Sequence, residues 1–259
     1  MIRTFCRFEQ AGSAGAGYGE IVDGILYPIN AGEIFSDGAR ELEDGIPVSE
    51  VHLRAPVLPS KIVCVGRNYA EHASELGNKV PTEPLIFLKP PSSIIGSGDE
   101  IVIPVQSDQV EHEGEIGVVI GRTARKLSEG DDPRSYVFGY TCINDVTARD
   151  IQRKDVQFTR GKSFDTFCPV GPVVVSGLNP AELSVETRVN GVVKQSGVVQ
   201  DMVFPVEFLL RYISNIMTLL PGDLIATGTP AGVSRMVSGD VVEVEIPGIG
   251  VLTNPIRSQ

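Results

Sequence analysis

The chain has 259 residues, which suffices for one large domain or for a large domain with a small appendage. Hydrophobic residues make up 42% and charged residues 21%, so the composition excludes disordered, collagen-like and coiled-coil proteins. A formal net charge of −11 disfavours binding to nucleic acid or to an anionic membrane, because both need a basic surface.

The first 55 residues are predicted to form a small β-rich N-terminal domain. Residues 18–29 alternate apolar and polar side chains, as half-buried strands do. The N-terminus lacks the apolar core of a signal peptide, and 18 consecutive apolar residues occur nowhere, so we expect a soluble, cytoplasmic protein. Two prolines within residues 54–61 precede the apolar run 62–65 and suggest a boundary, with a second domain over 60–259.

Strands are predicted to dominate the rest of the chain. The 28 glycines and 18 prolines exceed the average combined share of about 12%, which indicates frequent turns and short strands. Asn190-Gly191 lies between two alternating runs and predicts a type I′ hairpin turn. Helical periodicity covers residues 146–157 and 205–220. Because helices and strands do not alternate regularly, we expect an α+β fold with a β-rich core.

The second of these helices has a predicted buried face. Pro205 is expected in its first turn. The apolar positions that recur at helical spacing are Phe208, Leu209, Tyr212, Ile213 and Ile216.

The most informative stretch is EHEGEIGVVIG, residues 111–121. In a strand, Glu113 and Glu115 share a face, and two carboxylates about 6–7 Å apart repel by about 2–3 kcal/mol at an effective dielectric near 20. A bound cation would remove this cost. The alternative is a solvent-facing acidic stripe that continues at Glu111. Gly117 and Val119 on the same face favour a covered face instead.

A third carboxylate, Asp145, follows a strand-like run and precedes a predicted helix. Together with Glu113 and Glu115 it would form an all-oxygen site suited to Mg²⁺ or Mn²⁺, with Ca²⁺ as a further candidate. Three carboxylates leave an excess negative charge, which Lys162 could offset. The alternatives are a helix N-cap for Asp145 and a solvated loop lysine for Lys162.

A short helix is predicted within residues 66–77. Asn68 and Glu71 have capping-box spacing, and Gly77 is a natural stop. His72 and Glu75 share a face, so the carboxylate can orient the imidazole and make its other nitrogen a better base. Such a short helix could act as a lid. The alternative is an exposed pair without function.

The other histidines and the cysteines carry less functional signal. His52 lies near the linker, and His112 lies on the strand face opposite Glu113, so a hydrogen-bonded core or surface role is expected for both. The cysteines show no metal or disulfide spacing and are expected to be buried and reduced. They are Cys6, Cys64, Cys142 and Cys168.

Residues 221–230 are predicted to end a strand in small and hydroxyl residues. Thr227, Gly228 and Thr229 could offer N–H and hydroxyl donors to a ligand carboxylate. The alternative is a tight turn that only terminates the strand.

Several of these motifs together resemble the fumarylacetoacetate hydrolase superfamily. In chain order they are VGRNYAEH, FLKP, HEGEIGVVIG, NDVTARD, GKSFDTFCPVGP and GDLIATGTPAGV. The match covers roughly residues 60 to 257, and the size resembles the short bacterial members. The resemblance implies a mixed β-sandwich roll after a small N-terminal domain, and a homodimer.

The resemblance also implies roles for individual residues. Glu113, Glu115 and Asp145 match the ligands of a divalent cation, usually Mg²⁺ or Mn²⁺. Lys162 matches a lysine near that metal, and His72 with Glu75 matches the lid dyad of the hydrolytic members. Residues that match substrate contacts in some relatives are Arg149, Gln152 and Thr229. Lys89 matches the FLKP motif without an assigned role.

The implied reaction is metal-dependent cleavage of a C–C bond in an acylpyruvate, a 2,4-dioxo acid, through a pyruvate enolate. The same site would also suit an oxaloacetate decarboxylase or a 2-hydroxyhepta-2,4-diene-1,7-dioate isomerase, or an isomerase of 5-carboxymethyl-2-hydroxymuconate. The His72–Glu75 pair favours the hydrolase. A hypothesis from another class is a non-catalytic protein whose cation only joins two strands. We expect a small 2-oxo acid as the substrate and no nucleic-acid partner.

Overall fold

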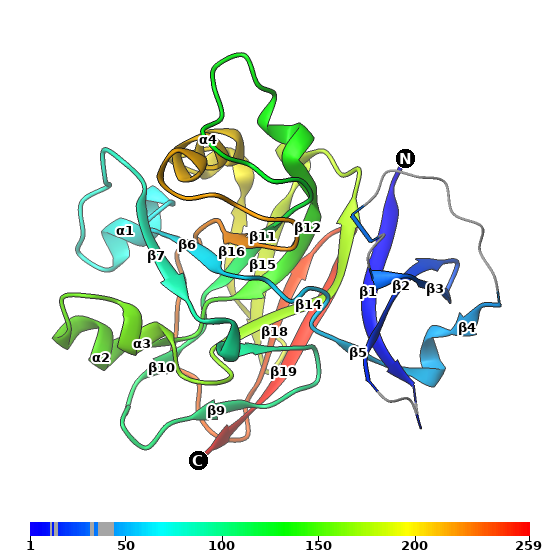
Figure 1. Cartoon of the computed structure of the whole chain (residues 1–259). Helices are drawn as coiled ribbons and strands as arrows, with labels where there is room; N and C mark the ends of the chain where they lie inside the picture. The colour runs from blue at the N-terminus through cyan, green and yellow to red at the C-terminus, as the bar shows by residue number, and fades with distance from the viewer. Residues whose placement is uncertain (11, 13–14, 32–33, 36–43) are drawn as a thin grey trace.

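The computed structural model describes residues 1–10, 12, 15–31, 34–35 and 44–259, and most of its regular elements are β-strands (Figure 1). The larger sheet has the strand order β4-β3-β2-β1-β14-β12-β11-β17-β6-β7, with β5 beside β1 and β8 beside β14. Its strands are β1 (Arg3–Gln10), β2 (Gly17–Val22), β3 (Ile25–Ile29), β4 (Ile46–Pro47), β5 (Val51–Arg54), β6 (Ile62–Gly66), β7 (Leu85–Lys89), β8 (Ile94–Ile95), β11 (Gly114–Ile120), β12 (Val137–Asn144), β14 (Cys168–Ser176) and β17 (Leu224–Ala226).

A second sheet packs against the middle of the first. It has the order β16-β15-β18-β19-β9 and consists of β9 (Ile101–Ile103), β15 (Ser184–Val189), β16 (Val192–Val198), β18 (Val241–Ile246) and β19 (Gly250–Ser258). Apolar side chains of β11, such as Ile116 and Val118, share one buried cluster with Val185, Val244 and Leu252 of this sheet. Two packed, strand-rich sheets confirm the predicted α+β, β-rich sandwich.

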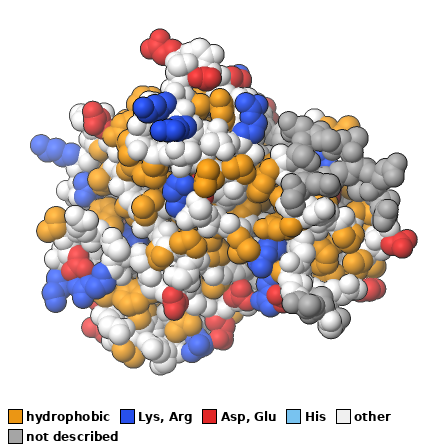
Figure 2. Space-filling view, viewed as in Figure 1, with side chains coloured by type: hydrophobic (Ala, Val, Ile, Leu, Met, Phe, Trp, Pro, Cys, Tyr) orange, Lys and Arg blue, Asp and Glu red, His pale blue; other side chains and the backbone are white. Residues whose placement is uncertain are grey.

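Four α-helices lie among the described residues: α1 (Ala70–Glu75), α2 (Arg149–Lys154), α3 (Thr159–Lys162) and α4 (Val206–Ile216). The first three gather beside β6 and β7 at one side of the molecule, away from the N-terminal strands (Figure 1). None of the described helices is long and apolar enough to cross a membrane. On the face shown in Figure 2, Lys and Arg side chains are scattered in small groups among hydrophobic and acidic ones.

The N-terminal strands extend the larger sheet. The alternation in residues 18–29 predicts strands, and β2 and β3 lie there; they form a hairpin whose turn at Asp23-Gly24 has positive φ angles of 50° and 80°. β1 pairs antiparallel with β14, with Phe5 opposite Val174. The expected boundary at residues 54–61 falls between β5 and β6, and the division into domains 1–55 and 60–259 stays a prediction. Residues 11, 13–14, 32–33 and 36–43 of the first span lie outside the described residues.

Two local predictions are confirmed. Asn190 and Gly191 connect β15 to β16 with φ angles of 51° and 74°, as a type I′ turn requires. All four cysteines are free and buried.

The predicted face of the last helix is only partly right. α4 buries Val206, Leu209, Leu210 and Ile213. Two of the residues predicted for its buried face are instead exposed, Phe208 at 47% and Ile216 at 55%. Phe208 instead stacks on Phe204 and Tyr212, with ring centroids 5.6 and 6.2 Å apart. Pro205 is the N-cap residue and does not lie in the first turn. Because Phe208 packs against other aromatic rings and not into the core, its apolar character led to the wrong prediction of a buried position.

The helix predicted over 146–157 is also shorter than expected. Thr147–Ala148 form β13, which pairs with β10 (Val110–Glu111), and only Arg149–Lys154 are α-helical. The β13 pairing brings the start of α2 next to the acidic stretch around Glu111, which the helical periodicity did not predict.

Candidate active site and metal centre

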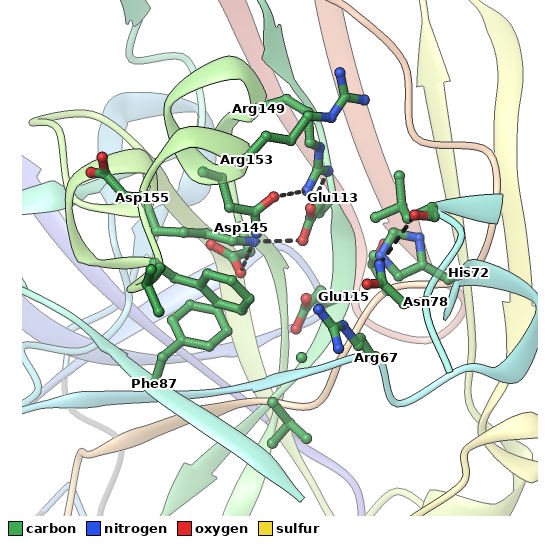
Figure 3. A pocket seen from close by; sticks show the side chains of 18 residues that line it. Arg67, His72, Asn78, Phe87, Glu113, Glu115, Asp145, Arg149, Arg153 and Asp155 are labelled. Carbon is green, nitrogen blue, oxygen red and sulfur yellow. Dashed lines mark hydrogen bonds and ion pairs between the residues drawn. The ribbon is translucent and has the colours of Figure 1, made fainter. Parts of the chain in front are cut away.

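Glu113, Glu115 and Asp145 converge in one buried site (Figure 3). Glu113 immediately precedes β11, Glu115 lies in it, and Asp145 immediately follows β12. β11 and β12 are antiparallel, and the Asp145 N–H donates to the Glu113 carbonyl oxygen at 2.8 Å. One oxygen from each of the three carboxylates lies within 4.8 Å of the chosen oxygens of the other two. Exposures of 4%, 2% and 1% exclude the solvent-facing acidic stripe.

The backbone around the carboxylates is fixed by hydrogen bonds. Asn144 Oδ1 accepts from the Glu113 N–H at 2.9 Å. The Gly228 N–H, beyond the end of β17, donates to Glu115 Oε2 at 2.7 Å. Thr227 Oγ1 donates to the Ile116 carbonyl oxygen at 2.8 Å. The donors predicted at residues 227 and 228 therefore serve the protein itself, and that part of the prediction is wrong.

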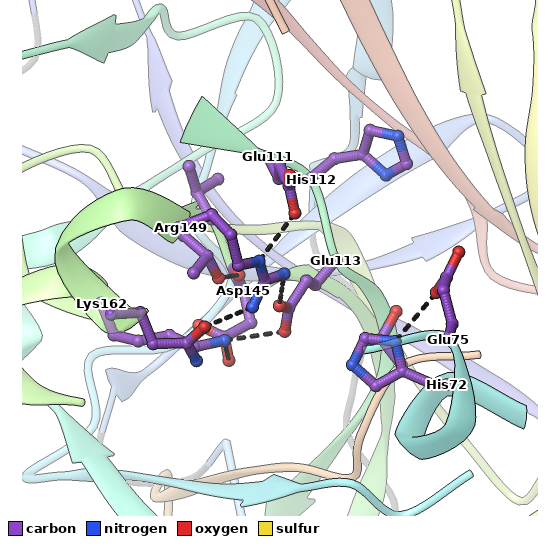
Figure 4. A network of polar contacts seen from close by, with 12 residues as sticks. His72, Glu75, Glu111, His112, Glu113, Asp145, Arg149 and Lys162 are labelled. Atoms are coloured by element: carbon purple, nitrogen blue, oxygen red, sulfur yellow. Dashed lines mark hydrogen bonds and ion pairs between the residues drawn. The ribbon is translucent and has the colours of Figure 1, made fainter. Parts of the chain in front are cut away.

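Three cations surround the carboxylates, and Figure 4 labels two of them, Arg149 and Lys162. Lys162 Nζ donates to Glu113 Oε2 and Asp145 Oδ2, both at 2.7 Å, so the solvated-loop alternative for this lysine is wrong. Lys89 Nζ donates to Asp145 Oδ1 at 2.6 Å. Arg149 donates to Glu113, and its Nε donates to Glu111 Oε2 at 2.7 Å. Asp145 caps no helix, because the N-cap residue of α2 is Ala148.

The charges divide the carboxylates into two kinds. Burial favours the protonated form of Glu113, but the nearby Lys162 and Arg149 outweigh it and lower the pKa of this carboxyl. Glu115 has no ion pair with a described Lys or Arg. Its pKa is raised well above the ordinary value, first by burial and then by the negative charges of Asp145 and Glu113.

The donor set fits a divalent cation. All three side chains offer carboxylate oxygens, which hard cations such as Mg²⁺ and Mn²⁺ prefer. No fourth His, Cys, Asp or Glu side chain joins this group within the described residues. Positive charge beside Glu115 would also relieve the repulsion that raises its pKa. Glu113, Glu115 and Asp145 would thus hold the cation.

His72 lies on α1 at the edge of the same site. It is 4% exposed, so the alternative of an exposed histidine is wrong. Its Nδ1 lies 3.4 Å from Glu75 Oε2, and the Gly232 N–H donates to both oxygens of Glu75 at 3.0 and 3.2 Å. Burial is the largest cause that lowers the pKa of His72. A buried, mostly neutral imidazole beside a carboxylate has the arrangement of a general base.

The capping box predicted for α1 is wrong. Tyr69 is the N-cap residue, and no side chain caps the helix, although Gly77 does follow its end with a φ of 69°. The Asn68 side chain instead accepts from the Phe204 N–H at 2.8 Å and donates to the carbonyl oxygens of Phe204 and Thr227 at 3.1 and 2.8 Å. Asn68 thus connects the start of α1, which carries His72, to the loop after β17, whose Gly228 N–H donates to Glu115.

Asn68→Ala is expected to lower the free energy of unfolding by about 3 kcal/mol, because it leaves buried backbone groups without partners. Urea denaturation measures this change. Asn215→Ala is the matched control, since Asn215 is exposed and should cost at most about 0.5 kcal/mol. An equal effect of the two substitutions would contradict the anchoring role of Asn68.

Eight of the nine predicted site residues line one cavity of about 330 Å³ (Figure 3). Glu75 is the ninth and contacts the cavity-lining His72. The eight are His72, Glu113, Glu115, Asp145, Arg149, Gln152, Lys162 and Thr229. Residues far apart in the sequence therefore meet around a single small pocket.

The three predicted substrate contacts already have protein partners. Arg149 Nη1 donates to Gln152 Oε1 at 2.5 Å. Thr229 Oγ1 donates to the Gly114 carbonyl oxygen at 2.8 Å and accepts from Gln195 Nε2 at 2.7 Å. The structure shows these side chains at the pocket, and their contact with a substrate stays a prediction.

Sequence reasoning missed part of the site. The sequence assigns no role to Lys89, because a lysine at the end of an apolar strand can be exposed as well as buried. The hydrogen bonds from Arg149 to Glu111 and Glu113 depend on the pairing of β10 with β13, which the sequence did not predict. Arg67, Asn78 and Phe87 also line the pocket and left no signal in the sequence. His112 is a buried, hydrogen-bonded residue as expected, with Gln195 and Ser234 at 2.9 and 2.8 Å.

Comparison with known proteins agrees with the fold and with the cation site. The chain is 45% identical over 224 residues to the oxaloacetate tautomerase YisK of Bacillus subtilis, which covers 81% of this chain and 74% of that protein. The structure of a 2-hydroxyhepta-2,4-diene-1,7-dioate isomerase from Mycobacterium marinum is 40% identical and superposes with a TM-score of 0.89 over 99% of both chains. A maleylpyruvate hydrolase from Sphingobium sp. SYK-6, in complex with manganese(II) and pyruvate, is 29% identical with a TM-score of 0.79 over 98% of this chain and 99% of that one.

The sequence profile of the fumarylacetoacetate (FAA) hydrolase C-terminal family matches residues 61–257. This range includes every residue placed in the site. The chain therefore belongs to the fumarylacetoacetate hydrolase family.

Proposed function

We propose that this protein is a divalent-cation-dependent enzyme that acts on a short 2-oxo acid through its enol or enolate form. The observation that carries the proposal is the convergence of three buried carboxylates with His72 on one small cavity. Glu113, Glu115 and Asp145 would hold Mg²⁺ or Mn²⁺, and the cation would supply positive charge for the 2-oxo acid end of the substrate.

The leading reaction is hydrolysis of the C–C bond of an acylpyruvate. His72, oriented by Glu75, takes a proton from a water molecule that attacks the distal carbonyl carbon. The bond to the pyruvate fragment then breaks, and pyruvate leaves as its enolate, which is protonated afterwards. Lys162, whose ammonium group contacts Glu113 and Asp145, would stabilise the developing negative charge. The buried His72–Glu75 pair supports this assignment.

A second candidate is keto–enol tautomerisation of oxaloacetate or a related isomerisation, favoured by the names of the Bacillus and Mycobacterium relatives. This reaction needs only proton transfer and no water. Decarboxylation of oxaloacetate would use the same cavity. One arrangement of residues can therefore support several reactions of an enolised 2-oxo acid.

A substrate panel separates these candidates. The purified chain with Mg²⁺ or Mn²⁺ is given acylpyruvates, oxaloacetate and 2-hydroxy-dienoates, the loss of enol absorbance is followed, and the products are identified. Pyruvate plus a carboxylic acid indicates hydrolysis, pyruvate plus CO₂ indicates decarboxylation, and unchanged mass indicates tautomerisation. If no compound on the panel reacts, the proposed function is wrong.

We further propose a cytoplasmic homodimer that acts on a small molecule; the family resemblance supports the dimer, and the net charge of −11 argues against nucleic-acid binding. Sedimentation of the purified chain tests the dimer, which would have twice the mass of the monomer. A monomer that retains full turnover would contradict it.

The pH dependence of turnover should report His72. Its pKa is lowered chiefly by burial, Arg149 and Lys162 act in the same direction, and Glu113 and Glu75 oppose them. Because a general base must be neutral, kcat/KM should rise with pH through a pKa below about 6.5, the ordinary value of histidine, and be constant near pH 7. Glu75→Gln removes a group that raises this pKa, so the acidic limb should move to lower pH. An acidic limb above pH 6.5 would contradict the assignment.

A further inference from the structure

We propose that Arg67 binds the distal carboxylate of the substrate, so that this enzyme selects 2-oxo dicarboxylates over 2-oxo monocarboxylates. The inference rests on the proposed function, and it names the class of substrate for the same pocket.

Arg67 lies on the Glu115 side of the cavity, opposite the side from which Arg149 approaches (Figure 3). It directly follows β6, between residues that pack closely on Gly228. A Cβ atom added to Gly228 would lie 2.6 Å from Asn68 Cβ and 3.1 Å from the Val65 carbonyl oxygen. Because the Gly228 N–H donates to Glu115, this contact fixes the Arg67 segment beside the carboxylate cluster.

The side chain of Arg67 differs from the other cations of the pocket in its partners. Arg149 and Lys162 are bonded to Glu113, and Arg153, which is exposed at the rim, donates to Gln109 at 3.4 Å. Of the cations that line the pocket, Arg67 alone has no side-chain hydrogen bond or ion pair with any residue that the structure describes. Arg67 is half-buried, and its guanidinium N–H groups therefore remain available to an anion in the cavity.

The backbone of Arg67 is held in an unfavourable conformation. Its φ of 60° lies in the left-handed region, which L-residues other than Asn and Asp rarely adopt. The next residue, Asn68, is locked by its bonds to Phe204 and Thr227, and this locking keeps the strained geometry in place. Strained backbone of this kind clusters at ligand-binding and active sites, and here it occurs at a residue that lines the pocket.

The occupant follows from the chemistry of the two ends. A cavity of about 330 Å³ is at the small end of ligand sites and suits a compact acid. With the 2-oxo acid end at the carboxylate cluster on the Arg149 side, the other end of a short chain that crosses the cavity would reach Arg67 on the opposite side. A carboxylate there matches the two-donor fork of a guanidinium, whereas an uncharged alkyl end would leave it without a partner.

Calorimetry with two unreactive ligands tests the proposal without turnover. Malate and lactate share a 2-hydroxy acid end, and only malate has a second carboxylate. The wild-type chain loaded with Mn²⁺ should bind malate at least about 10-fold more tightly than lactate, as one charge-assisted pair predicts. Arg67→Met should bring the two affinities within about 2-fold, and Arg67→Lys should retain part of the preference.

Arg153→Met is the control, because it removes the same charge from the rim of the pocket. It should change the ratio of malate to lactate affinity by less than about 3-fold, since an exposed charge at the rim is screened. Equal affinities in the wild type, no measurable binding of malate, or the same loss in both variants would overturn the proposal. The panel assay tests the proposed function separately. If the chain reacts with no compound on the panel but prefers malate through Arg67, the proposed enzymatic function is wrong and the role of Arg67 in binding the second carboxylate is retained.

Discussion

Replacing Glu115 with glutamine is expected to weaken Mn²⁺ binding on the order of 100-fold or more, because even changes outside the ligand set of a metal cost about 10- to 100-fold. Turnover of a 2-oxo acid should fall with the loss of bound cation. The metal-free protein, in contrast, should be as stable as the wild type or more stable. Calorimetry with MnCl₂ and urea denaturation of the metal-free protein measure the two effects.

The charges around Glu115 explain why the substitution should weaken Mn²⁺ binding without lowering the stability of the metal-free protein. This side chain forms no ion pair with a described Lys or Arg, and it is buried beside the like charges of Glu113 and Asp145. Glutamine keeps an oxygen that can accept the hydrogen bond from the Gly228 N–H and removes the repulsion. The substitution therefore removes a cation ligand without breaking an interaction that stabilises the metal-free fold.

Asp145→Asn is the contrasting variant. Asp145 accepts from Lys89 and from Lys162, both of which are buried. Loss of the charge leaves the buried ammonium group of Lys89 without a carboxylate partner and leaves Lys162 paired with Glu113 alone, and breaking a buried ion pair costs about 3–5 kcal/mol. This variant should lose both cation affinity and stability.

The pair of variants also decides whether the cation is only structural. If the cation merely joined two strands, Glu115→Gln would lower the stability of the cation-loaded protein and turnover would not require the metal. Wild-type affinity for Mn²⁺ in the Glu115 variant would contradict the assignment of this carboxylate as a ligand. Removal of metal with EDTA should stop turnover and leave the fold intact, because Lys89, Arg149 and Lys162 neutralise most of the buried negative charge.

The sequence predicts the acidic cluster because its signal is local. Glu113 and Glu115 are two residues apart at a strand, and the apolar run after them predicts the burial that makes the charges costly. Asp145 required one further step, the pairing of two strands that follow each other in the chain, which is common for consecutive strands. The three carboxylates could therefore be placed together before the structure was known.

The partners of this cluster could not be found in the same way. Lys89 comes from β7, which reaches the site only through the order β17-β6-β7 in the sheet. Asn68 shows a capping pattern, yet its side chain bonds to Phe204 and Thr227, 136 and 159 residues further along the chain. Interactions over such sequence separations depend on the topology, and neither spacing nor periodicity encodes them.

Replacing His72 with alanine is expected to abolish acylpyruvate hydrolysis, with a loss of about 10²- to 10⁴-fold in kcat, because a general base typically contributes that much. Mn²⁺ affinity should stay unchanged, since His72 does not belong to the carboxylate cluster and its ring nitrogen contacts Glu75. Steady-state kinetics and calorimetry on the same preparation measure both quantities. Circular dichroism shows whether the fold is intact.

Glu75→Gln provides the graded comparison. Glu75 touches His72 and the Gly232 N–H, so its loss should weaken the orientation of the imidazole without removing it. We expect a smaller decrease in kcat than for His72→Ala, together with the shift of the acidic limb described above. If the His72 variant hydrolyses acylpyruvates at the wild-type rate, another group must activate the water. If it loses hydrolysis but still tautomerises oxaloacetate, His72 serves only the reaction that needs water, and proton transfer to the enolised acid must come from a different side chain of the pocket.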